Sequence, residues 1–381
     1  MPELPEVETI ARDLAPLITG ATFTDVATDW PRVVASPAPE AFRAGLVGRA
    51  IVGVGRRAKW LLLDLDDGSV LAVQVKMTGQ VFVVPEDAPM DRHVHLVLRL
   101  DDGRELRLRD IRKFGRVGLY PRGADGEVLG GDGAAPLFAR HGPEPLEADF
   151  TLRVFRDRLR ARRGRLKPIL LDQSFIAGVG NIYADEALWR ARLHPLRSVG
   201  TLRPADERRL YLELRAVLAE AIERRGSSVD DYMAPQGDGE MQDHLEVYQR
   251  TGLPCLRCGR PLRRIVVGGR GTHFCSWCQR LPATDRPGAR AILRETRAGR
   301  GGAVAPEVAA RRAETTKKAA ATRRAAIRRG TRWSELPAGP GIVGSQPDTA
   351  ADSARADGGA SGEPPKAALP PEAAAPPEAA G

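Results

Sequence analysis

The four cysteines of the chain lie in one short region, and their spacing fits a metal site. Cys255 and Cys258 form one Cys-x2-Cys pair, and Cys275 and Cys278 form a second pair after a gap of sixteen residues. Two tight turns of this kind can present four thiolates tetrahedrally to zinc. Because protein would fill all four positions, we expect one structural Zn2+ without an open site for water. Cysteines in a chain without an export signal stay reduced, which favours metal ligation over disulfides.

Cations lie between and beside the two cysteine pairs. Arg270 and Thr272 fall between the pairs, and Arg263 and Arg264 are nearby. A hairpin with these side chains could lie along a phosphate backbone. A zinc ribbon that only supports the fold has the same spacing, so the cysteines alone leave that role open.

The sequence begins with residues that could act as a nucleophile and an acid. Pro2 is small enough for Met1 to be removed, which would leave a secondary amine with a pKa of about 8. Such an amine can attack the C1′ carbon of a sugar and form an iminium, and the adjacent Glu3 can supply a proton. The same residues would also suit the approach to a helix. By themselves they favour that structural interpretation.

A glycine-rich turn, Gly178 to Gly180, precedes an amphipathic segment that ends at Trp189. Such a turn leaves backbone N–H groups free at a helix N-terminus, where a phosphate can bind. An ordinary helix capped by Asn181 would explain the same residues. The run of basic residues from Arg160 to Lys167 shifts the interpretation toward DNA.

The overall charge points to a polyanionic partner. Lys and Arg outnumber Asp and Glu by 58 to 49, which gives a formal net charge of +9. A basic surface that binds nothing would have the same charge. No apolar stretch approaches the ~18 residues of a membrane helix, so insertion and export are not expected. We expect a cytoplasmic, nucleoid-associated monomer.

The elements that must position these residues form an α+β multidomain protein. The sequence predicts a first helix over 5–17, with Pro5 at its first position and Glu6 and Glu8 at the positive end of its dipole. From about 20 to 122 the apolar residues alternate with period two, and Asp-Gly turns follow at 67–68 and 102–103. This pattern predicts an antiparallel β-sandwich as the N-terminal domain, residues 2–122.

The rest of the chain divides by composition. Residues 123–148, rich in Gly and Pro, indicate a linker, and the pattern over 149–240 is helical. Its clearest helix is 205–225, which ends before Gly226. One face of that helix is apolar and contains Leu210, Leu214, Val217 and Ala221. The cysteines define a small unit over 245–282.

Residues 283–381 change composition twice. The stretch 311–329 contains eight basic residues against one acid, Glu314, and a Pro/Ala/Gly-rich tail without aromatic residues follows Trp333. Such a tail buries too little apolar surface to offset the entropy of ordering, so we expect disorder. The basic stretch is expected to hold the protein near DNA without choosing a sequence, or to be a solvated tail.

Seven separated motifs together resemble formamidopyrimidine-DNA glycosylase, and they occur in that family's order over about residues 2–282. They are PELPEVET at 2–9, GRRAKWLLL at 55–63, KMTG at 76–79, DIRKFG at 110–115, GVGNIYADEALW at 178–189, VYQRTGLPC at 247–255 and CQR at 278–280. The resemblance implies a β-sandwich, a helix-two-turn-helix domain and a zinc finger, with damaged double-stranded DNA held in a cleft between them. It also implies excision of oxidised purines through an N-terminal proline Schiff base, followed by β,δ-elimination at the abasic site.

The same resemblance implies roles for individual residues. Pro2 would be the nucleophile and Glu3 the acid near the sugar ring oxygen, with Lys59 and Lys167 as active-site lysines. Asn181 and Arg270 would bind phosphates of the DNA. Three residues would fill the space left by the flipped-out base, where an apolar chain and an aromatic ring replace stacking and a guanidinium bonds the orphaned base. These are Met77, Arg112 and Phe114.

Two departures from the family pattern and two alternatives remain. Gln74 stands where the family commonly has His, and the loop from Gly226 to His244 is hard to match, so lesion choice is less well defined than DNA cleavage. The sister branch similar to endonuclease VIII prefers oxidised pyrimidines, but the opening motif and the trio at 77, 112 and 114 favour the purine branch. A noncatalytic DNA-damage-binding protein would not need Pro2 and Glu3 together with both lysines.

Overall fold

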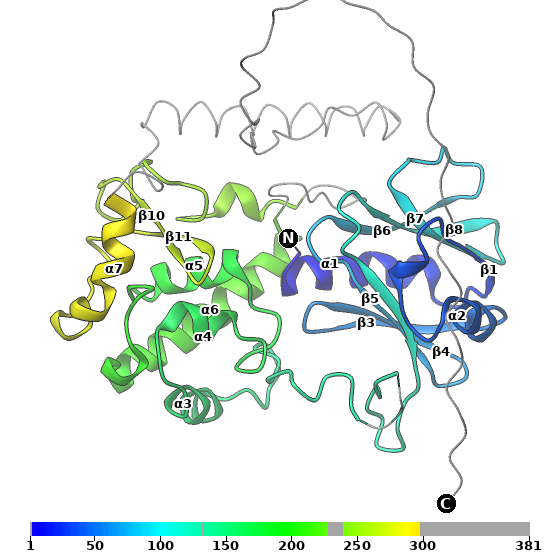
Figure 1. Ribbon diagram of the computed structural model, residues 1–381, viewed down its shortest axis with the longest axis horizontal. Coiled ribbons are helices and arrows are strands. Elements are labelled where there is room, and N and C mark those ends of the chain that lie inside the picture. The colour runs from blue at the N-terminus through cyan, green and yellow to red at the C-terminus, as the bar shows by residue number, and fades with distance from the viewer. Residues whose placement is uncertain (1, 132, 134, 228–238, 298–381) are drawn as a thin grey trace, which may run out of the picture. The chain divides into compact units, whose positions relative to one another are not determined.

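The computed structural model describes residues 2–131, 133, 135–227 and 239–297. Figure 1 shows their elements, with the first strands in blue to cyan, the central helices in green and the last hairpin and helix in yellow. The basic stretch and the tail, for which disorder was expected, lie outside the described residues. Within the described part, no helix is long and apolar enough to cross a membrane.

The chain opens with helix α1, Leu4–Ile18, one residue longer at each end than expected. Glu3 is its N-cap residue, and the Glu3 N–H donates to Glu6 Oε2 at 2.8 Å. Pro5 therefore occupies the second helical position. The buried face of the helix packs into the core of the first domain, through Val7, Ile10, Leu14 and Ile18. Burial of this face fixes the position of the residues that precede it.

Two sheets form the predicted β-sandwich. The four-stranded sheet has the order β1 (Phe23–Ala27), β7 (Val94–Leu100), β8 (Arg104–Asp110) and β6 (Gly79–Pro85). The five-stranded sheet has the order β2 (Val34–Ser36), β9 (Arg116–Tyr120), β5 (Val70–Gln74), β4 (Trp60–Leu65) and β3 (Ile51–Arg57). Apolar residues of both sheets share one core, as the alternating pattern predicted.

The expectation of a purely antiparallel domain was wrong in one place. Strand β2 pairs with β9 in parallel. A 3-10 turn, Pro31–Val33, precedes β2, and helix α2, Pro39–Leu46, follows it. Residues 37–115 separate the two paired strands, which is long enough for the chain to return in the same direction. The two Asp-Gly turns are present as predicted, with Gly68 and Gly103 at φ values of +83° and +78°.

The predicted linker is packed against the sandwich. Val128, Leu137 and Phe138 contact a small cluster on the five-stranded sheet that includes Val70 and Tyr120. Phe138 also meets Trp60 edge to face, with ring centroids 5.9 Å apart. The segment therefore covers apolar surface on that sheet as well as connecting two domains.

The second domain is helical, with α3 (Leu152–Arg160), α4 (Leu166–Leu171), α5 (Asn181–Arg190) and α6 (Pro204–Glu223). Two 3-10 turns, Val199–Thr201 and Met241–His244, complete its described part. The predicted apolar face of α6 is fully buried, through Leu210, Leu214, Val217 and Ala221. The helix ends at Glu223, and the Gly226 N–H donates to Ala221 O at 2.7 Å.

The cysteine-bearing unit contains a hairpin of β10 (Arg263–Val267) and β11 (Arg270–Phe274). The folded part was expected to end at 282, but it continues. A 3-10 turn, Ala283–Asp285, leads into helix α7, Arg286–Arg297. Ala289, Ile292 and Leu293 of this helix pack on the hairpin. The Arg-rich composition concealed this apolar face, which is what makes the helix part of the fold.

Candidate active site

The start of α1 is attached to the N-terminus of α5. The Leu4 N–H donates to Gly178 O at 3.0 Å. The Glu3 carboxylate, 1% exposed, accepts hydrogen bonds from the N–H groups of Ile182 at 2.9 Å and Tyr183 at 3.4 Å. The free N–H groups predicted as a phosphate seat therefore bind the carboxylate of Glu3. This is a correction, and its cause is that a side chain of the same protein reaches the positive end of the helix first.

Two glycines make this close approach possible. A Cβ on Gly180 would lie 2.3 Å from Glu3 Cδ, inside contact distance. Gly178 has a φ of +80°, and a Cβ there would lie 2.7 Å from the Leu4 Cβ. The glycine-rich motif thus brings the beginning of the chain against the helical domain.

Asn181 does not cap α5 as the alternative interpretation had it. It is the first residue of the helix, and Gly180 holds the N-cap position. Its side-chain amide donates to Gly271 O of β11 at 3.0 Å. Its Oδ1 is buried and accepts no hydrogen bond from the described residues. Asn181 therefore joins the helical domain to the hairpin that carries Arg270.

Burial raises the pKa of Glu3, and this rise is opposed by the positive charge of Lys59 and by the N–H of Ile182. The neighbouring Glu6 carboxylate raises the pKa further. Glu6 is held in place because it accepts hydrogen bonds from the Tyr183 hydroxyl at 2.5 Å and from the Ser227 N–H at 2.8 Å. A carboxyl group in this environment retains its proton to a higher pH than an exposed glutamate.

Lys59 lies in the two-residue turn between β3 and β4. The preceding Ala58 has a φ of +54°, a strained value for a residue with a side chain. Glu144 holds this turn, because it accepts the Ala58 N–H at 2.6 Å and pairs with Arg56 at 2.7 Å and Arg57 at 2.5 Å. Burial lowers the pKa of Lys59, while the Glu3 and Glu6 carboxylates oppose this. The turn therefore places an ammonium group beside the two acids.

Lys167, the second predicted lysine, is entirely buried at the start of α4. Its ammonium pairs with Asp185 Oδ1 at 2.5 Å and donates to Gly271 O at 3.3 Å. Burial lowers the pKa of Lys167, and the Asp185 and Glu3 carboxylates oppose this. The structure thus brings Lys167 into the electrostatic environment of Glu3, although its direct partners belong to the helical domain and the hairpin.

The three residues predicted to fill the space left by a base lie together on two neighbouring loops. The Arg112 guanidinium is 5.3 Å from the centre of the Phe114 ring and 3.7 Å from Met77 Sδ. Phe114 is 46% exposed. The buried Asp110 joins the loops, because it accepts hydrogen bonds from the Thr78 hydroxyl and from the Phe114 N–H. The hydrogen bonds of Asp110 therefore fix the loops that carry the exposed aromatic ring of Phe114 and the guanidinium of Arg112.

The sequence interpretation missed the residues that hold the site together. These are Glu6, which was explained by the helix dipole alone, and Asp110, Glu144 and Asp185. Three of them lie inside motifs quoted above, and Asp110 directly ends a strand, which was an available signal. The sequence spacing of Glu6, Glu144 and Asp185 does not show which group each carboxylate binds.

The four cysteines converge as their spacing predicted. All four Sγ atoms lie within 4.8 Å of one another, and those of Cys258 and Cys275 are 3.6 Å apart. Zinc–sulfur bonds of about 2.3 Å in a tetrahedron separate neighbouring sulfurs by about 3.8 Å. The donor set and its geometry therefore fit one Zn2+.

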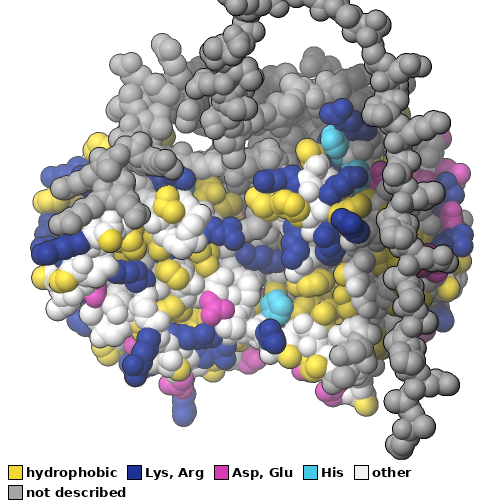
Figure 2. Space-filling view, in the orientation of Figure 1, with side chains coloured by type: hydrophobic (Ala, Val, Ile, Leu, Met, Phe, Trp, Pro, Cys, Tyr) yellow, Lys and Arg dark blue, Asp and Glu magenta, His cyan; other side chains and the backbone are white. Residues whose placement is uncertain are grey.

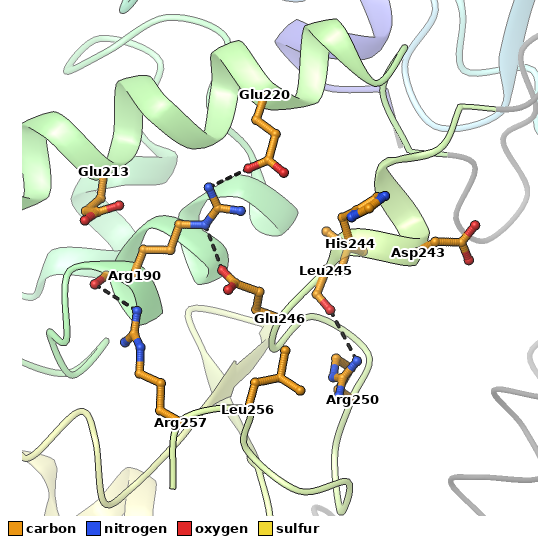
Figure 3. A pocket seen from close by; sticks show the side chains of 10 residues that line it. All are labelled: Arg190, Glu213, Glu220, Asp243, His244, Leu245, Glu246, Arg250, Leu256 and Arg257. Atoms are coloured by element: carbon orange, nitrogen blue, oxygen red, sulfur yellow. Dashed lines mark hydrogen bonds and ion pairs between the residues drawn. The ribbon is translucent and has the colours of Figure 1, made fainter.

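A polar cavity of about 570 Å3 lies elsewhere, between α5, α6 and the segment that leads into the cysteine unit. Figure 3 shows Arg190 pointing into it and paired with both Glu220 and Glu246. Leu256 and Arg257 also line it. Among the described residues, no predicted catalytic or DNA-contacting side chain lines this cavity, so we do not place the chemistry there.

Three family profiles match the chain in order. The formamidopyrimidine-DNA glycosylase N-terminal domain matches residues 1–117, and the H2TH domain of the same enzymes matches 141–233. A zinc finger found in FPG and IleRS matches residues 252–281. These ranges fall on the sandwich, the helical domain and the cysteine unit.

Curated relatives and solved structures agree with the profiles. Formamidopyrimidine-DNA glycosylase of Roseiflexus is 49% identical over 282 residues, which are 74% of this chain and 100% of the relative. The Chloroflexus aurantiacus enzyme is 50% identical over 73% of this chain and 98% of its own length. Lactococcus lactis Fpg with abasic-site DNA superimposes with a TM-score of 0.67 at 37% identity, covering 73% of this chain and 99% of that one. Thermus thermophilus Fpg superimposes with a TM-score of 0.65 at 44% identity, covering 74% of this chain and 100% of that one.

Proposed function

The chain belongs to the formamidopyrimidine-DNA glycosylase family, and from this premise we propose how its own residues perform the reaction. It is a base excision repair enzyme that removes oxidised purines, namely 8-oxoguanine and formamidopyrimidines, and is also an AP lyase. Its partner is damaged double-stranded DNA. We propose that it acts on this DNA in the cytoplasm, in association with the nucleoid. The observation that supports the assignment of residues most strongly is the buried carboxyl of Glu3 beside Pro2, held at the N-terminus of α5.

In the proposed first step, the neutral amine of Pro2 forms a bond to C1′, and the damaged base leaves with the electrons of its glycosidic bond. Glu3 donates its proton to the ring oxygen O4′ as the C1′–O4′ bond breaks, so that the sugar opens and an iminium joins Pro2 to C1′. The proton lost by the Pro2 nitrogen passes to the departing base. The raised pKa of Glu3 suits an acid in this step. Lys59 beside it would stabilise the carboxylate that forms.

The iminium also explains strand cleavage. It makes the C2′ proton more acidic, and loss of this proton expels the 3′ phosphate with the electrons of the C3′–O bond. A second elimination would then release the 5′ phosphate, which is the β,δ outcome. We propose that the ammonium groups of Lys59 and Lys167 stabilise the negative charge of the phosphates that leave in these steps.

Access to C1′ requires the lesion to leave the base stack. We propose that Met77, Arg112 and Phe114 enter the duplex in its place. The exposed side chains of Arg112 and Phe114, with the half-buried Met77 beside them on the Asp110-anchored loops, support this role. In the loop from Gly226 to His244, where the family often contacts the oxidised base, residues 228–238 lie outside the described residues.

The DNA backbone is proposed to contact Asn181 and Arg270, which the helix α5 and the strand β11 bring close through Gly271. Figure 2 shows dark blue Lys and Arg side chains spread over one face of the described molecule, with fewer Asp and Glu side chains among them. Gln74, which replaces the usual His, pairs in register with Arg116 across β5 and β9. Arg116 thus supplies a cation next to the altered position.

The decisive experiment is borohydride trapping on defined lesions. Incubated with borohydride and a duplex containing 8-oxoguanine, the protein is expected to form a covalent complex, because reduction of the iminium fixes Pro2 to C1′. A duplex with an oxidised pyrimidine should trap less. Preference for the pyrimidine would favour the endonuclease VIII-like alternative, and binding without trapping on either duplex would favour a noncatalytic protein.

Zinc removal is expected to weaken DNA binding. The protein should contain one zinc per chain, and Cys275→Ser should reduce affinity because the β10–β11 hairpin loses the metal that closes its base and Arg270 loses its fixed position. Affinity can be measured by fluorescence anisotropy and zinc by elemental analysis. Freshly purified, reduced protein without metal would contradict the assignment, as would unchanged affinity in a metal-free variant.

A further inference from the structure

Asp185, on the inner side of α5, has no role in the proposed reaction, yet it is the partner of an active-site lysine. Its side chain is fully buried. One carboxylate oxygen lies 2.5 Å from the Lys167 ammonium. The other accepts the His273 N–H of strand β11 at 2.8 Å and lies 3.2 Å from His273 Nδ1. One carboxylate therefore bridges helix α4 and the zinc-bearing hairpin.

The β10–β11 hairpin also binds Lys167 directly, through a backbone carbonyl group. The carbonyl oxygen of Gly271 accepts a hydrogen bond from the Lys167 ammonium at 3.3 Å and another from the Asn181 amide at 3.0 Å. Gly271 follows Arg270 in the strand, and His273 lies two residues further on. Lys167 and Asn181 thus both bind the strand that carries the proposed phosphate contact Arg270.

We propose that Asp185 is a positioning residue that holds Lys167 and the strand of Arg270 in one fixed arrangement. The ammonium charge of Lys167 near the reacting sugar and the contact of Arg270 with a DNA phosphate then both depend on this buried carboxylate. The inference rests on the proposed function, because that function gives Lys167 its place near the sugar.

Burial makes this carboxylate hard to replace. A lysine ammonium has three N–H donors, and two of them are satisfied here by Asp185 and by Gly271. If one partner of a buried ion pair is removed, the other is left charged without compensation or becomes neutral. The charged groups around Lys167 are Asp185 and Glu3, which favour its ammonium form, and Arg270, which disfavours it. His273 contacts the opposite oxygen of Asp185. Burial already lowers the pKa of Lys167, so loss of Asp185 should lower this pKa further.

The test variant is Asp185→Asn, which keeps the shape and one oxygen of the side chain. Base excision from the 8-oxoguanine duplex, measured in single turnovers, should fall by about ten- to a hundred-fold near neutral pH, the loss typical of a hydrogen bond to a charged group. Because Lys167 would regain its proton at lower pH, the deficit relative to the wild type should shrink as the pH is lowered. A purely structural defect would give the same deficit at every pH.

Two comparisons separate positioning from general damage. Asp206→Asn removes a buried carboxylate of the same domain that pairs with Arg197 and Arg209 instead of Lys167, and its deficit should not depend on pH. In a Lys167→Gln protein, the additional Asp185→Asn change should cost less activity than it does in the wild type, because part of the effect of Asp185 acts through Lys167.

A readout without DNA tests the same bridge. Hydrogen exchange of the amides in 270–274 should accelerate in Asp185→Asn and remain unchanged in Asp206→Asn, with one zinc retained in both proteins. Unchanged exchange, a pH-independent deficit or fully additive losses in the double variant would overturn the inference. Failure of the proposed function would instead appear in the wild-type protein, as absence of trapping, so the two failures are distinguishable.

Discussion

Protein that keeps Met1, or carries an N-terminal tag, is expected to lose both base release and strand cleavage. The nitrogen of Pro2 would then be part of a peptide bond, whose lone pair is delocalised into the carbonyl and cannot attack C1′. Loss of a covalent nucleophile can lower the rate by on the order of 10^6. Excision of 8-oxoguanine and cleavage of an abasic duplex should therefore both fall to background, and borohydride should trap no complex.

DNA binding is the internal control for this prediction. The residues proposed to contact DNA, Arg112, Asn181 and Arg270, lie on other elements, so affinity for an abasic duplex should change little. Mass spectrometry establishes which N-terminus each preparation has. Full activity in protein shown to retain Met1 would remove Pro2 from the mechanism.

Glu3→Gln is expected to lower base excision by about 100- to 10,000-fold, the range for loss of a general acid. Glutamine has nearly the same shape, and its one carbonyl oxygen can still accept the Ile182 N–H, the shorter of the two hydrogen bonds, so α1 should stay attached to α5. Cleavage of a ready-made abasic site should suffer less than excision. Because burial raises the pKa of Glu3, its ionised form costs stability as the pH rises through that pKa. The neutral variant avoids this cost and should have an unchanged or higher Tm.

The pH dependence gives a second view of Glu3. Excision by the wild type should decline at high pH as Glu3 loses its proton, and Lys59→Gln should move this decline to higher pH because the Lys59 charge lowers the pKa of Glu3. Asp13→Asn is the matched control on the same helix, since Asp13 pairs with Arg225 at 2.6 Å and should not affect excision. Unchanged excision by Glu3→Gln would assign the proton to another group.

Much of the fold could be predicted because its signals are local. Period-two alternation and Asp-Gly turns identified the sandwich, and the apolar face of α6 identified the helical domain. The parallel pairing of β2 with β9, the packing of Phe138 on the sheet and the attachment of α7 to the hairpin could not be predicted. Each depends on contacts between segments distant in sequence, for which local pattern carries no information.

The candidate site, like the fold, could be predicted only in part. The motifs supplied the residues proposed to contact DNA or the sugar, and the cysteine spacing supplied the zinc ligands. The carboxylates that hold these groups were not predicted, because a carboxylate in a sequence does not reveal its partner. Glu3 was proposed as an acid, but its attachment to an α5 N–H, 179 residues away, became visible only in the structure.

This same attachment has a consequence for the order of events during synthesis. Pro2 lies two residues before Leu4, whose N–H binds the glycine turn, so we expect Met1 to be removed most readily before α1 docks there. Ribosomes add about 5–20 residues per second, so α5 emerges roughly 10–40 s after the N-terminus. Throughout that interval the first residues are exposed, because the surface that will enclose them has not yet been made. The long separation in sequence therefore leaves time for removal of Met1, and under the proposed mechanism we expect repair activity only after Met1 has been removed and α1 has docked.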